Sequence, residues 1–136
     1  MNAADNPQLQ ILFDASARDE HTLAFPVADE IFGFHAQQAV EKLYKALITA
    51  HGREHSFTHN LKKLHDELAL LGESPPNLTL SLDELTEYAI EFRYKSGKPF
   101  SAEERDALRA SIAVLRAFVG ERCDLLKQAK VQVRVP

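Results

Sequence analysis

The sequence has few of the residues that interrupt helices or cross-link a chain. It contains 5 glycines, 6 prolines and a single cysteine in 136 residues, while apolar residues make up 45% of the chain. So few glycines and prolines favour long helices over many short strands. Cys123 cannot form a disulfide within the chain, which fits a reducing compartment. The length indicates one domain around a single core.

Long apolar runs and an excess of basic charge are missing as well. No apolar stretch approaches the roughly 18 residues of a membrane span, and no apolar run precedes Leu9. We therefore expect a cytoplasmic protein without a signal peptide. The net charge of −4 and the pI near 5.8 argue against nucleic-acid binding over the whole surface, while a local basic patch stays open.

The longest helical pattern covers residues 32–50. Its apolar residues recur at steps of three or four and form one core stripe, which comprises Phe32, Ala36, Ala39, Leu43 and Leu47. The polar band around this stripe comprises Gln37, Gln38, Glu41, Lys42 and Lys45. Two interpretations stay open for this band: hydrogen bonding to neighbouring helices, or the lining of a nucleotide cleft or partner surface.

Cap and stop residues predict where the first three helices begin or end. Asn6 is the expected N-cap of a helix that ends near Ala24, and Asp29 is the expected N-cap of the central helix. Gly52 marks the end of the central helix. Thr58 is the expected N-cap of the third helix.

The later helices carry similar signals. Gly72 ends the third helix, Ser81 caps the fourth, and Ser101 with Glu104 forms a capping box at the start of the fifth. We expect the fifth helix to end near Leu126 and residues 130–136 to form a flexible tail. The sequence thus predicts one all-α domain over residues 1–136. Its expected architecture is an antiparallel up-and-down bundle with a four-helix core and one extra helix.

Three stretches of the chain carry a family resemblance. They read FHAQQAVEKLYKALI in the central helix, THNLKKLHDEL at the start of the third, and EFRYKSGKPFSAEE before the last. Together they resemble the HEPN domains, small helical domains named for prokaryotic and eukaryotic nucleotide binding. The resemblance implies a helical bundle, often a homodimer, frequently encoded beside a minimal nucleotidyltransferase. Some members are endoribonuclease toxins of the toxin-antitoxin kind.

The nuclease members carry an Arg on a late helix, followed after four to six residues by a His. Here no His follows Arg116 anywhere in the chain. One formal match, Arg53 with His59, lies in an early loop, where His59 more simply fixes the start of a helix. We therefore predict a non-catalytic HEPN domain that binds nucleotides or pairs with a nucleotidyltransferase. The alternative is a divergent endoribonuclease that uses Arg116, or Arg53 with His59.

A basic cluster beside an aromatic residue suggests where a nucleotide would bind. A loop of this kind holds a phosphate while the ring stacks on a base. The expected nucleotide or anion site comprises Arg93, Tyr94, Lys95, Lys98, Gln38 and Lys42. In the competing interpretation, Arg93 pairs with a carboxylate and Tyr94 covers the end of the bundle.

Metal or thiol chemistry has little support in the sequence. The densest histidine cluster comprises His51, His55, His59 and His65, but Gly52 breaks the helical stacking that a zinc site on one face would need. We expect neither metal nor cofactor, and we expect Cys123 to be an inert packing residue.

Some apolar residues fall off the main stripes and predict self-association. They are Phe34, Ile48, Ile90 and Phe118. Exposed apolar groups in one patch usually mark a partner surface, and a two-fold homodimer is the commonest solution. We expect a homodimer whose interface includes the last helix around Phe118. The alternative is a monomer in which Phe118 turns inward.

Overall fold

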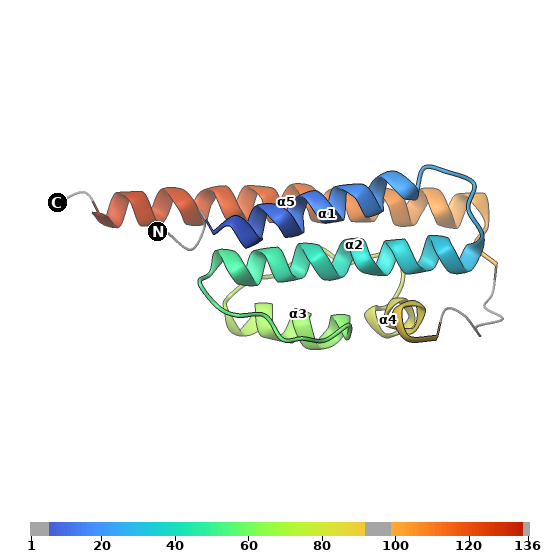
Figure 1. Ribbon diagram of the computed structural model, residues 1–136, viewed down its shortest axis with the longest axis horizontal. Coiled ribbons are helices and arrows are strands. Elements are labelled where there is room, and N and C mark those ends of the chain that lie inside the picture. The colour runs from blue at the N-terminus through green and yellow to red at the C-terminus, as the bar shows by residue number, and fades with distance from the viewer. Residues whose placement is uncertain (1–5, 92–98, 135–136) are drawn as a thin grey trace.

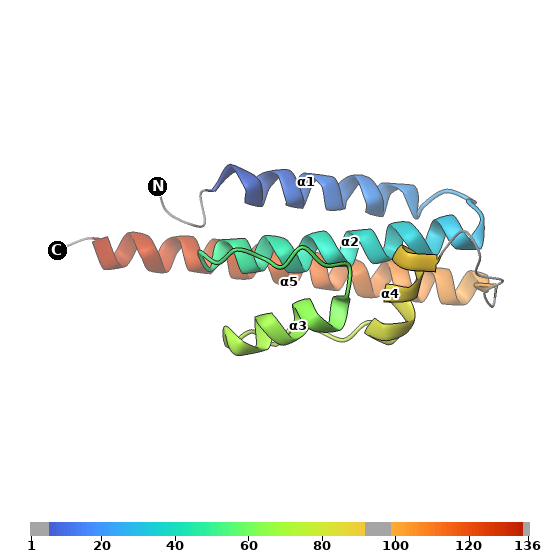
Figure 2. The same cartoon turned by 60° about the horizontal axis from the view of Figure 1, so that its bottom comes forward.

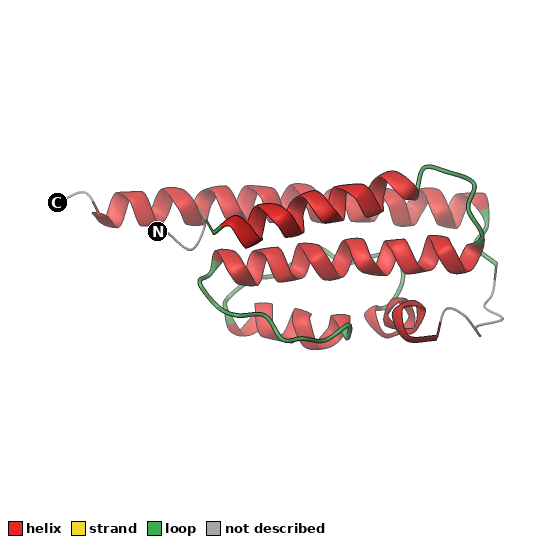
Figure 3. Cartoon of the chain, in the orientation of Figure 1, coloured by secondary structure: helices red, strands yellow, loops and turns green. Residues whose placement is uncertain are grey.

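The described part of the chain forms five α-helices, and the expected all-α class is confirmed. The computed structural model describes residues 6–91 and 99–134, and this part contains no strand (Figure 3). The helices are α1 (Pro7–Thr22), α2 (Asp29–Ala50), α3 (Leu61–Leu70), α4 (Leu82–Glu91) and α5 (Ala102–Arg134). No described helix combines the length and the apolar character needed to cross a membrane.

Helix α2 lies at the centre of the bundle. Helices α1 and α5 pack along one side of it. The two short helices α3 and α4 follow one another along the other side, with α4 turned across the direction of α3 (Figures 1 and 2). The short helices together fill one position of the bundle, which agrees with the expected four-helix core plus one extra helix. Because α2 has neighbours on most sides, nearly all of its residues are buried from Phe32 onward.

The helix directions differ from a strict up-and-down order. Arg105, near the start of α5, bonds Asp29 at the start of α2, and Arg122, late in α5, shares Glu73 with His51 at the end of α2. Helices α2 and α5 therefore run parallel. The expected antiparallel relation holds for α1 against both of them (Figure 1).

The connections between helices explain these directions. Residues 51–60 run from the end of α2 back alongside α3, where the Ser56 hydroxyl donates to Glu67 (Figure 1). An extended chain advances about 3.3 Å per residue, against about 1.5 Å in a helix. This connection thus returns along much of α2, and α3 then runs in the same direction as α2. A short turn would have made the two helices antiparallel.

The core forms around the predicted stripe of α2. Phe32, Ala36, Ala39, Leu43 and Leu47 are all fully buried, together with residues of every other helix except α1. Helix α1 contributes partly buried Leu9 and Phe13, and Leu23 follows at its end. This outcome confirms the core interpretation of the stripe.

Close packing fixes α4 against the start of α2. A Cβ atom added at Gly33 would lie 2.3 Å from the ring of Tyr88, so only glycine fits beneath that ring. The Phe100 ring completes the cluster, with centroids 5.1 Å from Phe32 and 5.6 Å from Tyr88. The contact positions the end of α4 and the start of α5 against the same part of α2.

The helix caps follow the sequence at some ends and differ at others. Asn6 accepts from the backbone of Gln8, Ser81 accepts from Glu84, and Ser101 and Glu104 exchange the two bonds of a capping box. Gly52 and Gly72 have φ values of 79° and 84° just beyond their helices, where glycine is favoured. These signals are confirmed.

Two predicted N-caps are wrong by one or two residues. Ala28 occupies the cap position of α2, because the Asp29 carboxylate accepts instead from Phe100 N and Arg105. Asn60 caps α3 by accepting from Lys63 N, and Thr58 accepts from Asn60 N in the turn before it. Long-range and turn contacts thus outweigh local cap preference at both positions.

Helix α5 continues to Arg134, beyond the end expected near Leu126. The segment predicted as a tail is therefore helical as far as residue 134. No glycine or proline lies between Gly120 and Pro136, and each added residue gains a backbone hydrogen bond once a helix exists. Propagation from an established helix outweighs the alternating valines at this end.

Candidate functional site

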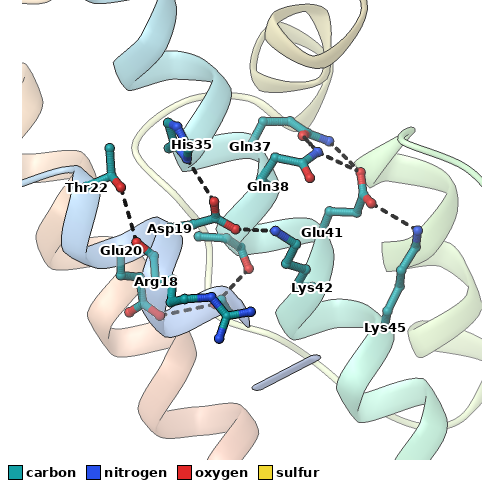
Figure 4. A network of polar contacts seen from close by, with 12 residues as sticks. Arg18, Asp19, Glu20, Thr22, His35, Gln37, Gln38, Glu41, Lys42 and Lys45 are labelled. Atoms are coloured by element: carbon teal, nitrogen blue, oxygen red, sulfur yellow. Dashed lines mark hydrogen bonds and ion pairs between the residues drawn. The ribbon is translucent and has the colours of Figure 1, made fainter. Parts of the chain in front are cut away.

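The polar band of α2 is an internal network and not a solvated face. Gln37, Glu41 and Lys45 are buried, and Gln38 and Lys42 are half-buried. Figure 4 shows that these side chains point toward carboxylates and amides of the same network. Of the two interpretations left open by the sequence, hydrogen bonding within the protein describes most of the band.

One part of the network centres on Asp19 of α1. This buried carboxylate accepts from Lys42 Nζ at 2.5 Å and from His35 Nδ1 at 2.8 Å, both on α2 (Figure 4). The nearby Ser16 hydroxyl donates to the backbone oxygen of Ala39 at 3.1 Å. Lys42 therefore neutralises a buried charge between α1 and α2, which leaves little of its charge for an external anion.

The other part centres on Glu41. Its carboxylate accepts from Gln37 Nε2 at 3.1 Å, Lys45 Nζ at 3.0 Å and His59 Nδ1 at 2.8 Å. Burial alone would raise the pKa of Glu41, but these hydrogen bonds hold the pKa below its usual range. Gln38 bonds Gln37 at 2.7 Å, so it too is engaged within the network (Figure 4).

His59 connects this network to the surface. Its side chain is 61% exposed, while the Glu41 side chain is only 6% exposed. A carboxylate only accepts hydrogen bonds, so His59 Nδ1 carries the proton of that bond and Nε2 is the second nitrogen of an oriented ring. Gln37 also donates to the backbone oxygen of His59 at 2.9 Å. In the protonated ring, Nε2 can donate a hydrogen bond to a bound anion.

The late-helix arginine is engaged inside the protein. Arg116 Nη1 donates to Glu20 Oε2 at 2.6 Å, and its guanidinium lies 4.0 Å from the centroid of the Phe13 ring. The same nitrogen lies 3.4 Å from the Phe13 backbone oxygen. Arg116 thus links α5 to α1. No described contact joins it to Arg53 or His59.

A third polar cluster was missed in the sequence. Glu73, whose side chain is 2% exposed, accepts from Arg122 Nε at 2.9 Å and from His51 Nε2 at 2.7 Å. Burial would raise the pKa of Glu73, but hydrogen bonds from Arg122 and His51 hold the pKa below its usual range. No spacing rule links residues 49 positions apart, so only the fold reveals this contact between α2, α5 and the loop after α3.

Several expected site residues lie outside the described part of the chain. They are Arg93, Tyr94, Lys95 and Lys98. Within residues 6–91 and 99–134, no group of three histidine, cysteine, aspartate or glutamate side chains could hold a metal ion. Cys123 is buried, and burial raises the pKa of its thiol to about 11, so a reactive thiolate is disfavoured.

These features describe a small all-α domain whose central helix carries buried charged groups tied to its neighbours. A family model for the HEPN domain matches residues 29–128. The chain therefore belongs to the HEPN domain family, and its role is related to nucleotides or RNA in general. A crystal structure, that of TT1696 from Thermus thermophilus, is similar at 20% identity and a TM-score of 0.46, covering 94% of this chain and 98% of that one. No curated protein matches.

Proposed function

We propose that the protein is a non-catalytic HEPN domain that binds a nucleotide or RNA, or that pairs with a nucleotidyltransferase-like partner. One observation carries the non-catalytic part: Arg116 is engaged by Glu20 and Phe13, and no histidine follows it in α5. Cleavage of RNA needs a base for the 2′-hydroxyl, an acid for the leaving oxygen and a cation on the phosphate. The bonded Arg116 supplies none of these to an external strand.

His59 supports binding at the edge between α2 and α3. Glu41 orients the exposed ring, and Lys45 balances the charge of that carboxylate within the network. A phosphate at Nε2 would receive a hydrogen bond from the protonated ring. Gln38 and Lys42, the expected contacts on α2, would act through the network and not by direct contact.

Titration of the purified protein tests this function. ATP, GTP and a short single-stranded RNA would be added at low and moderate salt, with binding measured by calorimetry. We expect at least one of them to bind, with an affinity that falls as salt rises. If none binds and no nucleotidyltransferase co-purifies, the proposal is wrong.

A divergent endoribonuclease is the second candidate, because Glu41 orients His59 as an acidic partner orients a general base. An assay on single-stranded RNA with Arg116→Ala, Arg53→Ala and His59→Ala variants separates the two functions. Cleavage that disappears in His59→Ala would favour the enzyme. Cleavage that survives all three changes would point to a contaminating nuclease.

We also propose a homodimer through α5, with a revised contact region. Phe118 is half-buried and packs against the core, and Ile48 is buried, so neither supplies the exposed surface expected from the sequence. Val114 and Leu125 of α5 are instead 58% and 44% exposed. Light scattering at micromolar concentration measures the oligomer. A Val114→Glu, Leu125→Glu variant that still forms dimers would remove this face from the interface.

A further inference from the structure

A cavity of about 430 Å³ opens at the end of the bundle where α1 begins and α2 ends. The residues that line it are Asn6, Gln8, Thr49, Arg53, Glu54, His55 and Phe57. Neither His59 nor Arg116 is among them. Its size falls within the roughly 300–1,000 Å³ of small-molecule sites. We call it the loop cavity, because residues 53–57 form one of its walls.

The connection that forms this wall is anchored along its length. His51 Nε2 bonds Glu73 at 2.7 Å, the Ser56 hydroxyl donates to Glu67, and His59 Nδ1 bonds Glu41 at 2.8 Å. These partners belong to the loop after α3, to α3 and to α2. A binding surface that is held before a ligand arrives loses less conformational entropy on binding.

Phe57 is fully exposed between these anchors. It is 100% exposed, although the core contains many buried apolar residues. The ring of His55 meets it in a T-shaped arrangement with centroids 6.0 Å apart, and the full exposure leaves a ring face open. Stacking of a nucleobase on such a face contributes roughly 1–3 kcal/mol per base and tolerates any base.

The polar groups of the cavity suit a phosphate and a sugar. Arg53 is exposed, and within the described part of the chain no ion pair or hydrogen bond engages its guanidinium. Arginine matches phosphate oxygens with two parallel donors. The positive end of the α1 dipole lies at the same cavity, through Asn6 and Gln8. Glu54 supplies an acceptor for a ribose hydroxyl or an exocyclic amine.

We propose that the loop cavity binds a nucleobase stacked on Phe57, with its phosphate at Arg53. This inference rests on the nucleotide or RNA binding proposed above, but it places the ligand in the loop cavity and not at His59. A free mononucleotide and a nucleotide within a single RNA strand share this chemistry.

Calorimetric titrations of the full chain with AMP, GMP, UMP and a six-nucleotide single-stranded RNA test the assignment. We expect Phe57→Ala to lower the affinity about tenfold or more. Arg53→Ala should lower the affinity and reduce the slope of log K against log salt by about 1. Leu70→Ala, an exposed apolar residue on α3, and Arg18→Ala, an exposed cation on α1, are the controls and should change the affinity less than twofold.

A spectroscopic variant adds an independent readout. The chain contains no tryptophan, so Phe57→Trp introduces a single indole at the site. We expect this variant to keep the affinity of the wild type and its fluorescence to be quenched by bound bases. The alanine variants separate the two ligands. If Phe57→Ala and Arg53→Ala lower the affinity for the RNA alone, the ligand is a strand. If they lower the affinity for the mononucleotides as well, the ligand is a mononucleotide.

Two outcomes would overturn the assignment in different ways. If the wild type binds but Phe57→Ala and Arg53→Ala bind equally well, the loop cavity is not the site and the proposed function stands. If the wild type binds no ligand in either titration, the assignment and the nucleotide or RNA binding on which it rests are both wrong. Circular dichroism of each variant excludes unfolding as the cause of a loss.

Discussion

The polar band of α2 and the loop tip, residues 53–57, both carry charged and polar side chains, but their surroundings differ. On α2, Glu41 and Lys45 are buried and bonded to each other. At the loop tip, Arg53 and Phe57 face solvent, although the connection that bears them is anchored. Buried charged groups are costly to leave unpaired. The α2 band thus governs stability, and the loop tip is available for a ligand.

Among the substitutions in the two regions, removal of the Glu41 carboxylate should lower the free energy of unfolding most. Glu41→Ala leaves Lys45 with an unpaired charge in the interior and releases His59. We expect the free energy of unfolding to fall by about 3–5 kcal/mol, measured by urea denaturation. Glu41→Gln keeps the side-chain shape and separates charge from packing. A loss below about 1 kcal/mol in Glu41→Ala would show that the network is not stabilising.

Glu73 should give the stability of the fold a pH dependence. The pKa of Glu73 is lowered in the folded state, so its contribution is present above the ordinary carboxyl pKa of about 4.3 and is lost as the pH falls through the folded value. We expect Glu73→Gln to cost about 2 kcal/mol at pH 7, since it weakens hydrogen bonds to Arg122 and His51. Urea titrations between pH 7 and pH 3 should show a shallower decline in this variant than in the wild type. Equal declines would contradict the assignment.

Arg116→Ala tests whether this arginine of α5 stabilises the fold or binds the ligand. The change removes the ion pair to Glu20 and the contact with the Phe13 ring, both partly exposed. We expect a loss of about 1–2 kcal/mol in stability. Nucleotide affinity should stay the same within twofold. A large drop in affinity without a drop in stability would instead show that Arg116 takes part in ligand binding.

Phe57→Ala should have the smallest effect on stability. Folding buries no apolar area of a fully exposed ring, so its removal costs no burial energy. We expect the midpoint of urea unfolding to change by less than the equivalent of about 0.5 kcal/mol. Substitution of buried Leu64 by alanine provides the contrast, with an expected loss of about 2–5 kcal/mol. A destabilised Phe57→Ala protein would mean that the loop tip packs against the bundle.

Much of the fold followed from local patterns. The capping box at Ser101 and the stop at Gly72 are each set within one turn of helix, and the apolar stripe of residues 32–50 repeats steps of three or four residues. The family resemblance also depended on short stretches, and the family match confirms it. Helix direction was not predictable in this way, because it depended on the path of residues 51–60.

The candidate site was predictable only in part. The sequence singled out Gln38, Lys42 and His59 as polar residues of interest, but it did not predict their partners. Asp19 meets Lys42 across 23 positions, and Arg122 meets Glu73 across 49. Phe57 attracted no attention in the sequence, since a lone aromatic residue in a polar stretch carries no periodic signal.

The sequence by itself determined the helices, most of their ends, the core stripe and the family, since these depend on contacts within a few residues and on short motifs. The tertiary structure decided which polar groups are buried. Whether Glu41 is a surface carboxylate or an internal partner of His59 depends on the return of the chain alongside α2. The same return leaves Phe57 in solvent, because the anchors at Ser56 and His59 fix the chain on either side of it.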